Sequence, residues 1–231
     1  MSQVDFHDAS VALKREQAAA SIRPTRGSYF RIGKRLADLI ACVFLLPICV
    51  PLIGVFWLLT RRDGGPGFFL QDRVGRNGEI FKCYKLRTMV VDAEAALAEI
   101  CAADPELAAE WKRDQKLRCD PRITPLGNFL RKTSIDELPQ VFNVLLGDMS
   151  LVGPRPMMPC QRKMYTSAGG GTGYFALRPG ITGPWQVDGR GETAFVDRIG
   201  YDNRYLSELS FGKDLSYLAR TVTVVFRQTG G

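Results

Sequence analysis

Residues 39–59 form a continuous apolar run, LIACVFLLPICVPLIGVFWLL, that contains no charged side chain. At a rise of 1.5 Å per residue, a helix of about twenty such residues can cross a hydrocarbon core of about 30 Å. Basic residues flank the run on both sides, with Lys34 and Arg35 before it and Arg61 and Arg62 after it. Since lysine and arginine beside a membrane segment favour the cytoplasmic side, a helix that enters the membrane and returns suits both clusters.

Two prolines in the run, Pro47 and Pro51, make such a return physically reasonable. Each lacks an N–H donor and clashes with the carbonyl group four residues earlier. We therefore predict a re-entrant membrane helix over residues 31–62, broken at Pro47 and Pro51. A single kinked transmembrane helix is the alternative, because transmembrane helices tolerate proline. A soluble core helix rarely needs so long an uncharged run, and a cleaved signal peptide would start nearer the N-terminus.

Charge and composition narrow the classes of function. The chain of 231 residues has a formal net charge of +7, which suits an anionic membrane surface or a phosphate-rich substrate. No helix-turn-helix, zinc-finger or aromatic RNA-binding signature is visible, so nucleic acid is not an expected partner. The single histidine, His7, disfavours a histidine metal site or a Ser–His–Asp triad. The six cysteines show no CxxC spacing and are interpreted as reduced cytosolic thiols.

The chain is predicted to have three parts. A disordered basic arm spans residues 1–30, the re-entrant helix spans 31–62, and a cytosolic catalytic domain spans 63–231. The expected fold class is mainly α with a small β-hairpin. We expect a monotopic membrane protein in which amphipathic interfacial helices surround the catalytic domain.

Local patterns predict the elements of the third part. The turn at Asn77 and Gly78 indicates a hairpin between strands at 68–71 and 79–84. Ser134, followed three residues later by Glu137, fits a capping box that begins a helix ending at Gly147. Further predictions are helices at 92–103, 105–117, 192–203 and 216–227, an amphipathic turn at 126–131, and a short strand at 182–187.

Polar residues concentrate in four segments of this part. The segments are KLRTM at 85–89, RKTSIDELPQ at 131–140, GPRP at 153–156 and RPGITG at 178–183. Each alone is a weak signal, since an Asp–Glu pair at a helix start usually only complements the helix dipole. An arginine between prolines is most often a rigid surface turn.

Together with the membrane segment, these motifs match the pattern of one protein family. The chain resembles the polyprenyl-phosphate hexose-1-phosphate transferases, the monotopic bacterial sugar transferases that begin exopolysaccharide, O-antigen and glycan assembly. The resemblance extends from about Arg31 to Arg227. Its most specific parts are RLAD at 35–38, QDRVG at 71–75, FKCYKLRTM at 81–89, residues 131–140, LLGDMSLVGPRP at 145–156 and RPGITG at 178–183.

The resemblance implies an enzyme on the cytoplasmic face of the bacterial inner membrane. It would transfer a hexose 1-phosphate, galactose or glucose, from a UDP-hexose to undecaprenyl phosphate, using Mg²⁺ and releasing UMP. Asp136 takes the position of the family's nucleophile and Glu137 that of its partner in the catalytic dyad. Both carboxylates are also the candidate ligands of Mg²⁺, and the sequence does not decide which one contacts the metal. Carboxylate oxygens suit this ion.

Five basic residues are candidates for binding the substrate phosphates: Lys85, Arg87, Arg131, Arg155 and Arg178. The planar fork of arginine matches pairs of phosphate oxygens. The alternative for each is surface solvation or contact with the headgroups of anionic inner-membrane lipids, which are also expected partners.

Two other functions stay open at this point. The chain could be a non-catalytic membrane scaffold of a polysaccharide assembly complex, or a membrane-bound phosphohydrolase that uses the same carboxylates and Mg²⁺. The sequence leaves open the identity of the hexose, the polysaccharide pathway and the oligomeric state, with a homodimer as one expectation.

Overall fold

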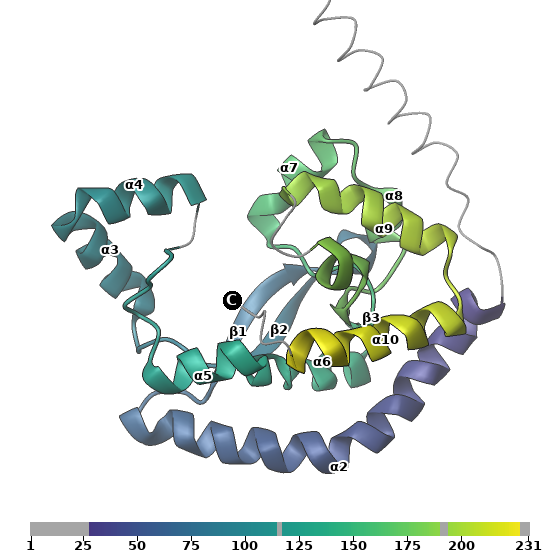
Figure 1. Cartoon of the computed structure of the whole chain (residues 1–231), viewed down its shortest axis with the longest axis horizontal. Helices are drawn as coiled ribbons and strands as arrows, with labels where there is room; N and C mark the ends of the chain where they lie inside the picture. The colour runs from purple at the N-terminus through teal and green to yellow at the C-terminus, as the bar shows by residue number, and fades with distance from the viewer. Residues whose placement is uncertain (1–27, 115–116, 190–193, 227–231) are drawn as a thin grey trace, which may run out of the picture.

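The computed structural model describes residues 28–114, 117–189 and 194–226. Within these ranges the chain is mainly helical, with two small two-stranded sheets, which confirms the predicted class at that level. The long helix α2 (Lys34–Thr60) extends along one side of the molecule, and the hairpin β1–β2 lies near the centre (Figure 1). Most of the arm predicted over residues 1–30 lies outside the described residues.

Helix α2 passes through Pro47 and Pro51 without interruption. It bends near its middle, where the two prolines lie (Figure 1). Each proline removes one internal hydrogen bond and crowds one carbonyl, which is enough to bend a helix whose other hydrogen bonds persist. The predicted break at Pro47 and Pro51 is therefore a bend in one continuous helix.

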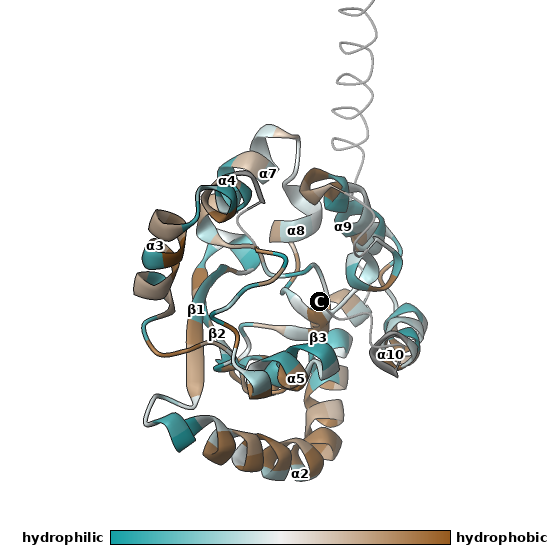
Figure 2. Ribbon diagram, turned by 60° about the vertical axis from the view of Figure 1, so that its left-hand side comes forward, coloured by the Kyte–Doolittle hydropathy of each residue, from teal (hydrophilic) through white to brown (hydrophobic). Residues whose placement is uncertain are grey.

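The two sides of α2 differ in their surroundings. Cys42, Cys49 and Ile53 are buried against the rest of the protein, whereas Phe44 is 75% exposed and Ile48 is 63% exposed. Hydrophobic residues, drawn in brown, cover most of this helix (Figure 2). Among the described residues, the segment Tyr29–Asp63 is the one helical stretch long and apolar enough to cross a membrane. The uncovered apolar side therefore needs lipid or another apolar cover.

Buried polar contacts attach the start of α2 to residues that lie much later in the chain. Lys34 Nζ lies 2.7 Å from Asp214 Oδ2, and the Tyr29 hydroxyl donates to the same oxygen. Asp38 Oδ1 accepts a hydrogen bond from the Leu151 amide at 3.1 Å. Arg35 donates to the carbonyl groups that end helix α6 (Gln140–Leu146). Because these partners are far apart in sequence, the start of α2 is held in one tertiary position.

The end of α2 is held by Arg87. Its guanidinium donates to the carboxylate of Asp63 and to the carbonyl oxygens of Thr60, Pro66 and Met89. The Arg87 side chain is only 8% exposed. These bonds use all five guanidinium N–H groups, so Arg87 joins α2 to the hairpin that follows.

Arg87→Met is expected to lower the free energy of unfolding by about 3 kcal/mol, because it removes the hydrogen bonds of a buried guanidinium and leaves the buried Thr60 carbonyl without a donor. The thermal midpoint in detergent measures this change. Arg62→Met, at an exposed position on the turn that follows α2, is the control. Equal midpoints for the two variants would contradict a structural role for Arg87.

Strands β1 (Phe68–Val74) and β2 (Ile80–Leu86) pair antiparallel, as predicted, and both extend further than expected. Asn77 and Gly78 adopt positive φ angles of 58° and 82°, a backbone that asparagine and glycine enter most easily. Register places Gln71 opposite Cys83 and Arg73 opposite Phe81. Since side chains alternate along a strand, Gln71, Arg73, Cys83 and Lys85 share one face of the hairpin.

The core lies between the hairpin and α2. It contains α5 (Pro125–Thr133), α6, and the parallel strands β3 (Ser150–Val152) and β4 (Gly180–Thr182). The strand predicted at 182–187 is displaced, because pairing with β3 ends at Thr182 and residues from Trp185 form a π-helical turn.

The remaining helices are α3 (Ala93–Ala103), α4 (Pro105–Asp114), α7 (Arg162–Ser167), α8 (Thr172–Phe175), α9 (Arg198–Ser207) and α10 (Phe211–Phe226). Short turns of 3₁₀ or π type are η1 (Tyr29–Gly33), η2 (Arg61–Asp63), η3 (Arg76–Gly78), η4 (Ile135–Glu137), η5 (Pro159–Gln161), η6 (Trp185–Gly189) and η7 (Phe195–Asp197). Asp104 caps α4 through the amides of Glu106 and Leu107, in agreement with the prediction. The helix predicted at 192–203 begins at Arg198, and residues 190–193 lie outside the described ranges.

Candidate functional site

Asp136 and Glu137 lie on the short turn η4, between α5 and α6. The predicted capping box at Ser134 is wrong, because Ser134 adopts a left-handed backbone with φ of 58° and makes no side-chain cap. Its amide instead bonds back to Arg131 at the end of α5. The chain therefore turns sharply before the two carboxylates, and α6 starts only at Gln140.

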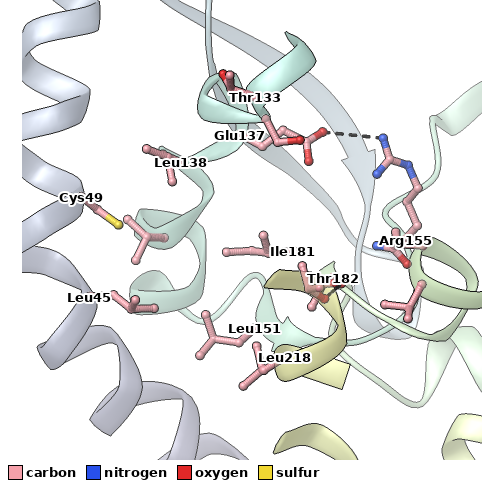
Figure 3. Close-up of a pocket in the computed structure, with 15 residues that line it drawn as sticks. Leu45, Cys49, Thr133, Glu137, Leu138, Leu151, Arg155, Ile181, Thr182 and Leu218 are labelled. Carbon is pink, nitrogen blue, oxygen red and sulfur yellow. Dashed lines mark hydrogen bonds and ion pairs between the residues drawn. The ribbon is translucent and has the colours of Figure 1, made fainter. Parts of the chain in front are cut away.

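Two basic side chains from different elements converge on Glu137. Lys85 Nζ, from β2, lies 2.8 Å from Glu137 Oε1, and Arg155 Nη2, from the loop after β3, lies 3.6 Å from the same oxygen. Figure 3 shows the pairing of Arg155 with Glu137 across the site. The three side chains are partly exposed, at 18%, 32% and 22% for Lys85, Arg155 and Glu137. Cations that stay accessible at such a site can also bind substrate phosphate.

Asp136 is more enclosed than its neighbour, with 8% of the residue exposed. The pKa of its carboxyl is raised from 3.8 to about 6, mainly by burial and also by the charge of Glu137. The nearby cations Lys85 and Arg131 act in the opposite direction. A buried carboxylate beside two cations has the setting of a nucleophile for a charged substrate.

The three remaining candidates for phosphate binding differ in position. Arg131 donates through Nε to the Thr88 hydroxyl at 2.9 Å and is close enough to Asp136 to stabilise its charged form. Arg178 instead donates to the Gly147 carbonyl at the end of α6. As shown above, all N–H groups of Arg87 are occupied at the end of α2. The structure thus brings Lys85, Arg131 and Arg155 to the dyad, and it does not bring Arg87 or Arg178 there.

The buried residue Arg198 holds the loop that carries Arg155 in place. The Arg155 carbonyl accepts a hydrogen bond from Arg198, a residue that is 2% exposed. The guanidinium of Arg198 lies against the rings of four aromatic residues, Tyr165, Tyr174, Trp185 and Phe195. Aromatic faces attract such a cation, so the position of Arg155 rests on a rigid support.

The raised pKa of Asp136 predicts how the free energy of unfolding depends on pH when no metal is bound. Folding favours the protonated carboxyl, so the stability that this group contributes is lost as the pH rises from about 4 to above 6. Asp136→Asn is therefore expected to raise the free energy of unfolding at about pH 7.5 by on the order of 2 kcal/mol. Thermal unfolding in a chelating buffer measures the difference. A variant less stable than the parent above pH 7 would contradict the assigned environment.

A sequence model described as "Bacterial sugar transferase" matches residues 29–228. The chain belongs to the bacterial sugar transferase family. This confirms the likeness inferred from the motifs. The match covers every element described above, including α2, both sheets and the dyad.

Several relatives of this chain carry informative names. The chain is 44% identical over 201 residues to the undecaprenyl-phosphate galactose phosphotransferase of Salmonella typhimurium, covering 87% of this chain and 42% of that protein. It is 42% identical over 200 residues to the UDP-galactose-lipid carrier transferase of Erwinia amylovora, with the same coverage. It is 37% identical over 223 residues to the exopolysaccharide production protein ExoY of Sinorhizobium fredii, covering 96% of both chains. The chain thus spans about two fifths of the length of the first two relatives.

The carboxylate oxygens of Asp136 and Glu137 are too few to hold Mg²⁺ by themselves. They fit the ion only if substrate phosphate and water supply its other ligands. Among the described residues, no group of three or more His, Cys, Asp or Glu side chains could hold a metal ion. The dyad alone offers two adjacent carboxylates. Since Mg²⁺ is often held by one or two carboxylates together with substrate phosphates and water, Asp136 and Glu137 meet this requirement.

Two residues that line the cavities beside Glu137 and Arg155 were not among the predicted site residues. Arg73 donates to the Pro156 carbonyl at 2.9 Å, and it lines a small polar cavity together with Lys85, Glu137 and Arg155. The alternation of the hairpin, which puts Arg73 on the face of Lys85, could have revealed it. The other is Gln186, which lies on the turn after β4. No periodic pattern marked Gln186.

Proposed function

We propose that this sugar transferase moves a hexose 1-phosphate from a UDP-hexose to undecaprenyl phosphate, releasing UMP, as the first membrane step of exopolysaccharide synthesis. One observation carries the proposal: Glu137, the neighbour of Asp136 in the sequence, and Arg155 line both a polar cavity and an apolar cavity that reaches α2. A charged donor and a lipid acceptor need that combination. The names of the Salmonella and Erwinia relatives support galactose as the hexose, with glucose as the second choice.

The proposed chemistry has two steps through Asp136. An oxygen of its carboxylate attacks the phosphorus that bears the hexose, and the bond to the oxygen shared with the other phosphorus breaks. UMP leaves with that electron pair. An oxygen of undecaprenyl phosphate then attacks the same phosphorus and displaces the Asp136 carboxylate. The product is undecaprenyl diphosphate hexose, and the free aspartate is restored.

Neighbouring residues have separate roles in this scheme. Lys85 and Arg155 bind phosphate oxygens and reduce the repulsion between the nucleophile and its anionic substrate. Arg131 favours the charged form of Asp136. Mg²⁺, held by Asp136 and Glu137 with the substrate, would neutralise charge on the diphosphate.

We also propose that α2 is re-entrant, with both ends on the cytoplasmic face of the inner membrane. Two features support this topology. Both ends of α2 are attached to the same domain, through Lys34 and Arg87, and residues along its length pack on that domain. Cysteines introduced at Phe6 and Gln71, after removal of the exposed Cys119 and Cys160, should react with an impermeant reagent from one side only. Labelling from opposite sides would overturn the topology.

A panel of UDP-sugars tests the function itself. Purified protein with undecaprenyl phosphate and Mg²⁺ should release UMP fastest from UDP-galactose. The lipid product should carry hexose and two phosphates. Release of free hexose phosphate instead would indicate a phosphohydrolase. If no UDP-sugar gave UMP, the protein would instead be the non-catalytic scaffold.

A further inference from the structure

A cavity of about 290 Å³ separates the bent middle of α2 from the dyad. Most of its wall is apolar and comes from α2, from the segment that follows the dyad, and from β3 and α10. Leu45 and Cys49 contribute from α2, and Leu151 and Leu218 from the opposite side (Figure 3). Glu137 and Arg155 form its charged end. The cavity therefore extends from α2 to Arg155 and to Glu137, which is beside the nucleophile in sequence.

Gln186 also lines this cavity, and its side chain has unused hydrogen-bonding capacity. The residue is 7% exposed, and neither its amide nitrogen nor its amide oxygen has a partner among the described residues. A buried amide without partners costs free energy, so natural proteins rarely keep one unless a ligand or water satisfies it. The amide group thus points to a polar ligand atom inside an otherwise apolar space.

The polar cavity on the other side of the Glu137–Arg155 pair is chemically different. It is lined by Arg73, Lys85 and Gln140 in addition to that pair. Such cations suit the diphosphate of a nucleotide sugar. An apolar wall offers little to hydroxyl groups or to a uracil ring, because their hydrogen bonds would be lost there. The larger cavity therefore fits a ligand with an apolar chain and one polar head.

Resting on the proposed function, we propose that this cavity binds the first isoprene units of undecaprenyl phosphate and that the Gln186 amide donates to its phosphate head. The phosphate lies near Arg155, beside the nucleophile. The rest of the chain leaves past Leu45 into the membrane. Gln186 is then an acceptor-binding residue, and the donor and the acceptor approach the Glu137–Arg155 pair from the two cavities that this pair lines.

A binding experiment without any nucleotide sugar tests the cavity. Native mass spectrometry of the protein in nanodiscs gives the affinity for undecaprenyl phosphate. Leu45→Trp, which fills the exit, should weaken it about tenfold, because chain methylenes lose their burial. Phe44→Trp is the matched control on the exposed side of α2 and should change the affinity less than about twofold. Inorganic phosphate should bind the two variants equally, which separates the lipid chain from the phosphate head.

A kinetic experiment tests Gln186. Gln186→Met keeps the shape but removes the donor, so the KM for undecaprenyl phosphate should rise about tenfold, well beyond any change in the KM for UDP-galactose. Gln186→Glu should raise the acceptor KM further by repelling the phosphate, and thermal midpoints check folding. Equal lipid affinity in Leu45→Trp and Phe44→Trp, or a Gln186→Met effect on the UDP-galactose KM alone, would overturn the proposal. If the parent protein binds the lipid in this cavity but releases no UMP, the proposed function fails and the lipid site stands.

Discussion

Replacing Asp136 with asparagine is expected to slow UMP release about a thousandfold or more, because an amide oxygen is a far weaker nucleophile than a carboxylate. The protein should still sediment with membranes, since α2 and its attachments at Lys34 and Arg87 are unchanged. Release of UMP from UDP-galactose in the presence of undecaprenyl phosphate measures the loss. Asp72→Asn, at an exposed site on β1, is the matched control.

The same variant separates an enzyme from a scaffold. A catalytic role requires that cells carrying Asp136→Asn lose the polymer although the protein is present at normal levels. Unchanged polymer production would indicate that the chain acts by organising other proteins. A variant that releases UMP at the parent rate in vitro would remove Asp136 from the chemistry altogether.

Replacing Lys85 with methionine is expected to slow UMP release about a hundredfold to a thousandfold, a typical loss for one preorganised cation or donor. Lys85 lies 2.8 Å from Glu137 Oε1, and its charge opposes the rise of the Asp136 pKa. Without it, Asp136 holds its proton to a higher pH. The acid limb of the pH–rate profile should therefore move upward as well.

Lys82 provides the control for this substitution. It lies on the same strand but is exposed and pairs with Asp72. Lys82→Met should leave both the rate and the pH profile near those of the parent protein. Equal losses for the two variants would mean that strand β2, rather than the charge of Lys85, matters for activity.

Local sequence patterns predicted the parts of the fold that local physics determines. The uncharged run required a long apolar helix, and the Asn77–Gly78 turn required a hairpin. Asp104 capped a helix as its side chain suggested. These features depend on neighbours a few residues away, which a sequence displays directly.

Features that depend on distant contacts were predicted less well. Pro47 and Pro51 bend α2 without ending it, because the prolines disturb only a few hydrogen bonds of a long helix. The capping box at Ser134 failed because Ser134 adopts a left-handed backbone and makes no side-chain cap, while Glu137 pairs with Lys85 and Arg155. The ion pairs of Glu137 involve partners that spacing along the chain does not reveal.

The candidate site divides in the same way. The motifs pointed to the dyad and to Lys85, Arg131 and Arg155, which the structure gathers. Charge alone could not distinguish these from Arg87, whose five donors are consumed at the end of α2. Gln186 carries no charge and no periodic signal, so only its burial without partners drew attention to it.

The covalent role of Asp136 can be tested most directly by mass spectrometry of the protein after incubation with UDP-galactose and Mg²⁺ but no lipid acceptor. We predict a mass gain equal to one hexose phosphate on the peptide that contains Asp136, absent in Asp136→Asn and discharged when undecaprenyl phosphate is added. A protein that forms the lipid product but shows no such adduct at any quench time would contradict a covalent role for Asp136.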